Sequence, residues 1–267
     1  MSNQLKVARD LQFRGHASHT DNVDGNISCH KVVLYDDFDG KAIDNTYDYT
    51  VAAIGAGTAT VTVPHSLTLT TAGSSEDDVD FATEVCFYGQ YNATIEARIR
   101  NDDVSASCYF FGFSDAQGEA ADKLAFLMNS TGDVTGVCTD GAGFIMDSDA
   151  TAAGYINILF GVTNKNATIG SVITGTTGTV GDASYKTLRV ELRNNVDSTT
   201  VDVLFYVNKD GKSIVPSEDF VGQNTDAITR TTALCGYIGY LTREAGVNTL
   251  DVDYLKIWSD RAWGTST

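Results

Sequence analysis

The chain has 267 residues, 42% of them hydrophobic, and a formal net charge of −17 from 35 acidic and 18 basic residues. A protein this acidic is repelled by the phosphate backbones of nucleic acids, and we therefore expect no direct nucleic-acid binding. No apolar run approaches the roughly 20 residues that a membrane-spanning helix needs, and the hydrophobic content is ample for one large β-sandwich.

Residues 1–30 differ from the rest of the chain. They hold few periodic apolar positions and are rich in Asn, Asp, His and Gly, which predicts an extended arm. The first 20 residues carry three basic side chains, Lys6, Arg9 and Arg14, and one acidic side chain, Asp10, so this segment has a net positive charge. Two interpretations remain: a solvated leader, or an arm that binds an acidic neighbour. The first residues lack the apolar centre of a secretion signal, so we expect no export by that route.

From residue 31 to 267 the pattern predicts a single β-sandwich domain. It begins with a short strand that leads into an Asp-Asp-Phe turn at residues 36–38. Short β-type segments follow at regular intervals, and no long stretch has helical periodicity. These segments are residues 58–63, 66–70, 91–100, 107–113, 124–128, 154–160 and 234–240.

The C-terminal third has the clearest strand pattern. In residues 185–193, Leu188, Val190 and Leu192 alternate with charged side chains, as on a half-buried strand. Residues 201–207 form the next apolar row and end at an Asn-Lys-Asp-Gly turn, residues 208–211. Residues 250–258, Leu-Asp-Val-Asp-Tyr-Leu-Lys-Ile-Trp, predict a closing strand.

This order of strands resembles the concanavalin A-like lectin/glucanase jelly roll, which includes laminin-G-like modules. The resemblance implies an all-β sandwich whose first and last strands pair. Retaining glucanases of this fold carry a Glu-x-Asp-x-Glu strand after a Tyr-Gly segment, which places two catalytic carboxylates on one face. Residues 87–100 resemble that leading segment, but residues 107–113, Ser-Cys-Tyr-Phe-Phe-Gly-Phe, contain no carboxylate. We therefore expect no enzyme, with a glycoside hydrolase or lyase that uses unrecognised catalytic residues as an alternative.

A second carboxylate pattern precedes that segment. Glu76, Asp78 and Asp80 have the spacing of a catalytic trio, but they lie in a polar stretch that a glycine introduces. We interpret them as a solvated acidic loop.

Calcium is the cofactor that the sequence favours most. Asp36, Asp37 and Asp39 cluster at the end of the first strand, and Asp251 and Asp253 lie on the last. If these strands pair, several hard oxygen ligands converge, as calcium requires. The alternative is that the aspartates cap turns and face water.

The cysteines and tryptophans suggest little chemistry. The five cysteines are scattered without a Cys-x-x-Cys spacing, which predicts reduced and mostly buried thiols. Sugar-binding sandwiches stack sugar rings on exposed aromatic side chains. We expect Trp258 to pack inside the sandwich and Trp263 to be exposed. A carbohydrate-binding, lectin-like module with a surface glycan as partner therefore stays an alternative function.

The strand pattern of residues 31–260 is also similar to concanavalin A-like domains in tailed-bacteriophage virion proteins, particularly those that decorate or cement the head. This resemblance implies a non-enzymatic virion protein, made in the host cytoplasm without a signal peptide. Its partner would be the major capsid protein or another virion protein, and it would form a homo-oligomer. The sandwich and the arm, with Lys6, Arg9 and Arg14, would then make the contact.

Overall fold

The computed structural model describes residues 31–39, 43, 49–62, 65–118, 124–150, 158–174 and 184–260. The predicted arm with Lys6, Arg9 and Arg14 lies outside the described residues, and so does Trp263. The helices among the described residues include none long and apolar enough to cross a membrane.

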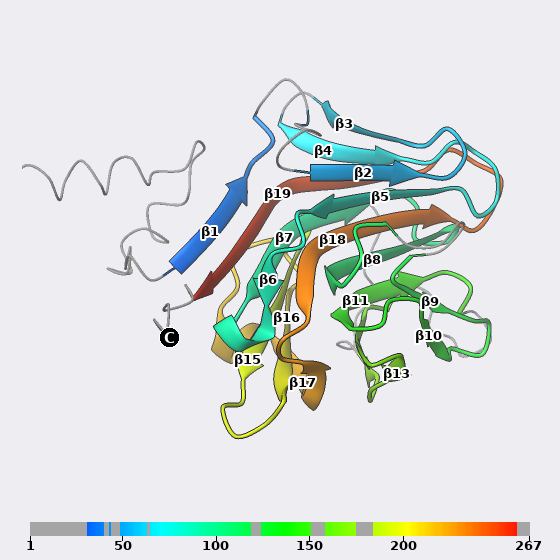
Figure 1. Cartoon of the computed structure of the whole chain (residues 1–267). Helices are drawn as coiled ribbons and strands as arrows, with labels where there is room; N and C mark the ends of the chain where they lie inside the picture. Colours follow the sequence, from blue (N-terminus) through cyan, green and yellow to red (C-terminus); the bar gives the residue numbers. More distant parts are fainter. Residues whose placement is uncertain are drawn as a thin grey trace, which may run out of the picture.

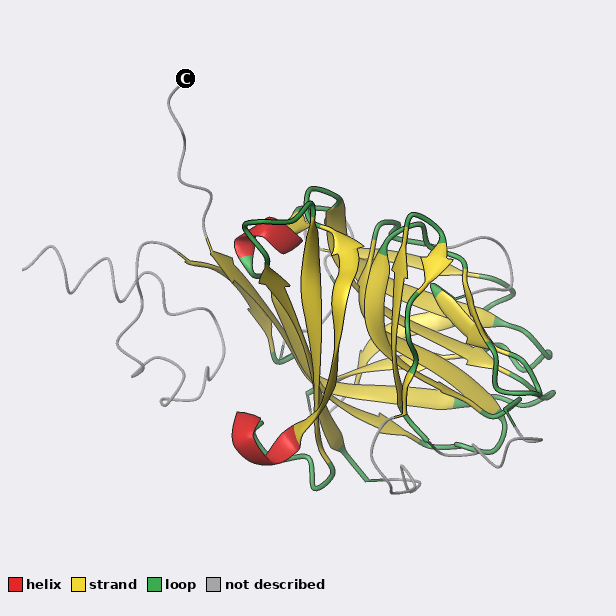
Figure 2. Ribbon diagram, turned by 90° about the horizontal axis from the view of Figure 1, so that it is seen from below, coloured by secondary structure: helices red, strands yellow, loops and turns green. Residues whose placement is uncertain are grey.

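Two large antiparallel sheets lie face to face as the layers of a sandwich (Figures 1 and 2). The eight-stranded sheet has the order β17-β16-β15-β7-β19-β4-β3, with β1 also paired to β19. Its strands are β1 (Lys31–Asp36), β3 (Thr58–Thr62), β4 (Ser66–Thr70), β7 (Thr94–Asn101), β15 (Lys186–Asn194), β16 (Thr200–Asn208), β17 (Phe220–Thr229) and β19 (Thr249–Asp260).

The nine-stranded sheet has the order β13-β12-β11-β8-β18-β5-β2, with β14 beside β12 and β6 beside β18. Its strands are β2 (Tyr49–Ala53), β5 (Asp78–Thr83), β6 (Phe87–Tyr88), β8 (Ser107–Ser114), β11 (Gly141–Asp147), β12 (Phe160–Lys165), β13 (Thr168–Ile169), β14 (Ile173–Thr174) and β18 (Ala233–Thr242). The remaining elements are the hairpin β9 (Phe126–Met128) and β10 (Val134–Gly136), and the short helices η1 (Gly89–Tyr91) and α3 (Pro216–Asp219).

The main core fills the space between the sheets, because strand alternation turns one row of each strand inward. In β15, Leu188, Val190 and Leu192 are buried, while Arg189 and Glu191 are only partly buried, which confirms the predicted alternation. In β8, Tyr109, Phe111 and Phe113 face this core. The strand predicted over residues 154–160 lies further along the chain, at β12, while residues 154–157 are outside the described residues.

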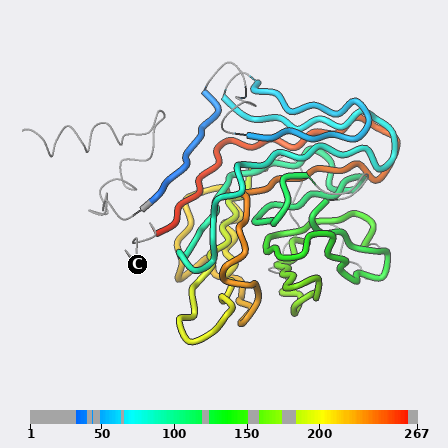
Figure 3. Tube along the Cα trace, in the orientation of Figure 1, coloured from blue at the N-terminus to red at the C-terminus, as the bar shows by residue number. Residues whose placement is uncertain are grey.

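The first and last strands pair, as the resemblance implied. Lys31 lies opposite Asp260 and Asp36 opposite Leu255, and the trace shows these two strands side by side, in blue and red (Figure 3). A register shift between Val252 and Tyr254 interrupts the pairing of β19 with β7. Such a bulge reverses the alternation beyond it, so Leu255 and Ile257 are buried and Trp258 faces outward. The expectation that Trp258 packs inside the sandwich is therefore wrong.

A second core covers the outer face of the nine-stranded sheet. Cys108 and Phe110 of β8 and Ile145 of β11 point to this face, where they pack under side chains from residues 124–138. The rings of Phe110 and Phe126 lie 5.0 Å apart, centroid to centroid, and β9 lies next to β11 in the fold (Figure 1). This face of the sheet is therefore part of the interior.

The cysteines follow the prediction within the described residues. Cys108, Cys138 and Cys235 are buried and Cys86 is exposed, and none of the four is in a disulfide. Cys29 lies outside the described residues.

Candidate functional site

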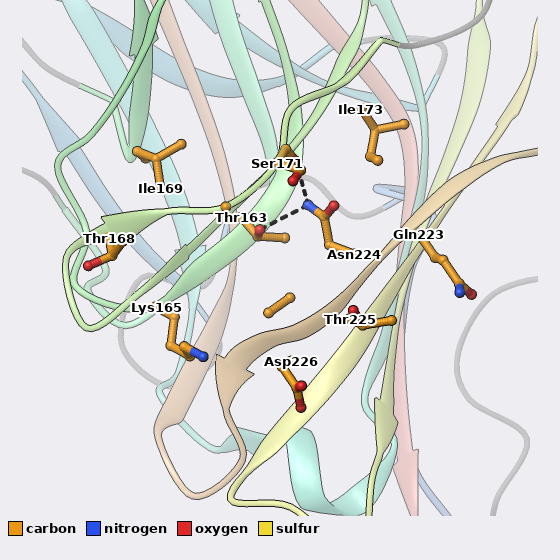
Figure 4. A pocket seen from close by; sticks show the side chains of 12 residues that line it. Thr163, Lys165, Thr168, Ile169, Ser171, Ile173, Gln223, Asn224, Thr225 and Asp226 are labelled. Atoms are coloured by element: carbon orange, nitrogen blue, oxygen red, sulfur yellow. Dashed lines mark hydrogen bonds between the residues drawn. The ribbon is translucent and has the colours of Figure 1, made fainter.

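A polar cleft of about 420 Å³ lies where edge strands of the two sheets meet. One side comes from the nine-stranded sheet, at β12, β13 and the turn before β14, and the other side comes from β17. Figure 4 shows the lining side chains. They are Thr163, Lys165, Thr168, Ile169, Gly170, Ser171, Ile173, Gln223, Asn224, Thr225, Asp226 and Ala227.

Asn224 joins the two walls of this edge cleft. Its Nδ2 donates to Thr163 Oγ1 at 3.0 Å and to the backbone oxygen of Ser171 at 2.7 Å, as the dashed lines in Figure 4 mark. Asn224 is buried. These bonds satisfy its amide donors and fix the spacing of the walls.

β17 is irregular where it lines the cleft. The pairing of β16 with β17 shifts register between Val201 and Val203, which leaves unpaired residues on β17. Asp226 stands in this bulge with a positive φ of 52°, and its carboxylate accepts hydrogen bonds from Thr200 at 2.6 Å and Ser198 at 3.2 Å. These bonds hold the pKa of Asp226 below its usual value, and the charge of Lys165 acts in the same direction.

The edge cleft presents amide, hydroxyl, ammonium and carboxylate groups, which suit hydrogen bonding to a polar ligand. Asp226 is the one carboxylate among its lining residues. Hydrolysis of a glycosidic bond uses two carboxylates about 5–9.5 Å apart, and the lining of the cleft offers one. Sequence reasoning missed it. The polar run Gln223-Asn-Thr-Asp226 was the available signal, because it interrupts the apolar alternation expected of a half-buried strand.

The face that the glucanase resemblance associates with catalysis is closed. The outward positions of β8 carry Cys108, Phe110, Gly112 and Ser114, all within the second core or beside it. In the neighbouring strand β11, the outward carboxylate is Asp147, whose side chain is fully buried against Arg243.

The interpretation of Asp78 and Asp80 as a solvated loop is wrong. Both lie in β5 and are almost fully buried, with 2% and 3% of their surface exposed. Asp78 Oδ1 accepts a hydrogen bond from the backbone of Ile54 at 3.0 Å, and Asp80 accepts one from Tyr237 Oη. Glu76 is instead ion-paired with Arg243, 2.9 Å away. Asp78 therefore bonds β5 to the chain after β2, Asp80 bonds β5 to β18, and Glu76 pairs with the residue that follows β18.

The five carboxylates predicted to bind calcium do not converge. Asp251 accepts hydrogen bonds from Thr68 and Arg100, and Asp253 pairs with Arg98 at 2.9 Å. Asp36 Oδ1 accepts from the backbone of Phe38 at 2.8 Å, and its Oδ2 accepts from Tyr49 Oη at 2.9 Å.

Asp37 accepts a hydrogen bond from the backbone of Asp39 at 3.4 Å, so the aspartates of this turn cap it as the alternative interpretation expected. Throughout the described ranges, no three His, Cys, Asp or Glu side chains are grouped as a metal site requires. Calcium binding stays a prediction.

Comparison with solved structures defines the fold. The carbohydrate recognition domain of Emp47p superposes with a TM-score of 0.58 and 10% identity, over 88% of this chain and 99% of that one. The Bacillus licheniformis β-glucanase superposes with a TM-score of 0.53 and 11% identity, over 86% and 98% of the two chains. The fold is a concanavalin A-like jelly roll.

This fold carries both carbohydrate recognition domains and glycoside hydrolases. The carbohydrate recognition domain of Emp46p, similar over 81% of this chain and 90% of that one (TM-score 0.53, 10% identity), has been solved in a potassium-bound form. No family model matches the sequence, and no curated protein matches it.

Proposed function

We propose that the protein is a non-enzymatic binding protein that decorates or cements a bacteriophage head. The observation that carries the non-enzymatic part is the closed outer face of the nine-stranded sheet. There β8 turns Cys108 and Phe110 into the second core. A polysaccharide must reach the catalytic carboxylates of a hydrolase, and this face offers a buried apolar layer in their place.

The attachment to the head is proposed to use residues 1–30. Lys6, Arg9 and Arg14 give this segment positive charge in a chain whose formal net charge is −17. An extended basic segment gains contact area and electrostatic attraction on an acidic neighbouring subunit, at the entropic cost of its ordering. The segment joins the sandwich at Lys31, beside Asp260 at the end of β19.

The proposed partner is the major capsid protein or another virion protein, and the location is the virion. A homo-oligomer on the head surface is part of the proposal. The acidic sandwich favours solubility and opposes non-specific association, which suits a protein exposed on the outside of a particle.

Co-sedimentation with capsids tests this function. The probe is particles assembled from the major capsid protein of the same genome. The full chain is expected to sediment with them in a fixed ratio. A chain that lacks residues 2–30 should stay in the supernatant while its circular dichroism matches that of the full chain.

A matched control keeps the arm but removes its charge, with Lys6→Gln, Arg9→Gln and Arg14→Gln together. It should bind more weakly, and raising the salt should weaken binding of the unchanged chain, because salt screens exposed charges. Failure of the full chain to sediment with particles would contradict the function. Equal sedimentation of the truncated chain would contradict the role of the arm.

A further inference from the structure

The outer face of the eight-stranded sheet holds a shallow pocket of about 320 Å³ around Trp258. We call it the Trp258 pocket. Its wall residues come from the end of β19, the start of β7 and the end of β15, and Trp258, Thr94 and Glu191 lie in one row across these three strands. The other polar residues around it are Asn92, Arg193 and Asp260.

Charged side chains lie on both sides of the Trp258 indole along the strand direction. Lys256 and Arg189 lie on one side, 5.0 Å and 5.4 Å from the ring centroid. Asp260 is two residues further along the same face of β19, about 6–7 Å in the opposite direction, and it lines the pocket. These cation–π contacts hold the ring in place, and Trp258 and Asp260 both line the pocket.

The polar groups of the pocket are also held in position. Glu191 accepts hydrogen bonds from Tyr206 Oη at 3.2 Å and from Arg193 Nη2 at 3.4 Å. Asp260 accepts one from Asn92 Nδ2 at 2.7 Å, and Asn92 Oδ1 accepts one from the backbone of Asn194 at 2.9 Å. Such preorganisation lowers the entropic cost of binding a ligand.

This combination of groups matches one class of ligand. A flat apolar indole packs on the C–H face of a pyranose ring, and carboxylate and guanidinium groups at its edges bond the ring hydroxyls. The volume lies at the lower end of the range of ligand pockets, roughly 300–1,000 Å³, which suits one sugar ring. Glu191, Asp260 and Arg193, whose side chain is 60% exposed, give the rim both acceptors and donors for ring hydroxyls.

We propose that the Trp258 pocket binds one pyranose ring of a glycan. This adds a ligand to the protein beyond attachment to a head, and it does not depend on that attachment. The site lies on the outer face of the eight-stranded sheet, away from both the edge cleft and the closed face of the nine-stranded sheet.

Tryptophan fluorescence tests the site directly, because the chain has two tryptophans. In a Trp263→Phe protein, the emission reports on Trp258 alone. The probes are cellohexaose, laminarihexaose, maltohexaose, mannohexaose, chitohexaose and hexagalacturonate. We expect at least one of them to change the emission saturably.

Calorimetry on variants of the full chain then locates the binding. Trp258→Ala should weaken it about tenfold or more, Arg193→Ala should weaken it less, and Trp258→Phe should retain part of it because a ring remains. Asn224→Ala alters the edge cleft and should leave binding unchanged. If Trp258→Ala does not fold, the affinities of the Trp258→Phe and Arg193→Ala proteins are compared with that of the unchanged chain instead.

Three results would overturn the proposal. The first is no response to any of the six probes at roughly 10 mM. The second is binding that Trp258→Phe and Arg193→Ala leave unchanged. The third is binding that Asn224→Ala abolishes, which would assign the glycan to the edge cleft.

Discussion

Arg243 and Asp147 form a buried bidentate ion pair. Arg243 Nε lies 2.9 Å from Asp147 Oδ1, and Nη2 lies 2.5 Å from Oδ2. Asp147 Oδ2 also accepts the backbone N–H of Met128 at 2.9 Å. Because Met128 belongs to β9, the pair ties the β9–β10 hairpin to β11 and to the chain that follows β18. The ion pair thereby holds the hairpin in place over the second core.

Asp147→Ala should lower the free energy of unfolding by about 3–5 kcal/mol, because it leaves the Arg243 charge buried without its main partner. Urea unfolding followed by circular dichroism measures this. Asp210→Ala is the matched control, since the Lys212–Asp210 pair is 74% and 70% exposed and such pairs contribute about 0–1 kcal/mol. Equal effects of the two substitutions would show that the Arg243 pair is not buried in solution.

Phe126→Ala should cost about 3–5 kcal/mol, because it removes a fully buried ring that packs on Phe110. Val196→Ala, at a 74% exposed side chain, should change the free energy by no more than about 0.5 kcal/mol. A loss below about 1 kcal/mol for Phe126→Ala would mean that the hairpin leaves the sheet face open. That face would then be accessible to a substrate.

Gly112 and Gly143 lie directly opposite each other in β8 and β11. A Cβ at Gly112 would overlap the backbone of Ala142 and Gly143, so Gly112→Ala must push the two strands apart. Gly246→Ala is the control, since its nearest neighbour, Asn248 Oδ1, would lie 3.9 Å away. Thermal unfolding should show a marked loss of stability for Gly112→Ala and little change for Gly246→Ala, and similar melting temperatures would contradict the tight pairing.

Cys86 is the exposed thiol among the described cysteines. Partial burial raises its pKa above the usual value, and the negative charge of Glu84 raises it further. At about pH 8 a raised pKa leaves less thiolate, so Cys86 should react with an aromatic disulfide reagent more slowly than free cysteine. Glu84→Gln should lower the pKa and speed the reaction, with no such effect expected in denaturant.

The experiment uses the Cys29→Ser protein, because Cys29 lies outside the described residues. Cys108, Cys138 and Cys235 are buried and should react only after unfolding. Rapid reaction of a second thiol in the folded protein would contradict the packing of the two cores.

The sandwich could be predicted where alternation is regular and local. Leu188, Val190 and Leu192 face the core as expected, and β1 pairs with β19. β11 was missed, because Gly141 and Gly143 interrupt its apolar pattern. The structure explains the glycine at 143, which lies opposite Gly112 where β8 and β11 approach closely.

The site residues were harder to predict, because their positions depend on contacts distant in sequence. Asp80 is buried against Tyr237, 157 residues away, so its polar local sequence wrongly indicates a solvent-exposed loop. Trp258 faces outward because of a bulge at Val252–Tyr254, and one extra residue is invisible in a period-2 pattern. The edge cleft joins Thr163 and Asn224 from two sheets, and only the fold brings them together.

Mass spectrometry of purified particles decides whether the protein belongs to the virion head, as we propose. Phage particles produced from the genome that encodes the chain are purified on a density gradient and digested. We expect peptides from both the arm and the sandwich, in a fixed ratio to the major capsid protein across gradient fractions. Particles free of these peptides, with the protein present in the lysate, would contradict a place in the virion.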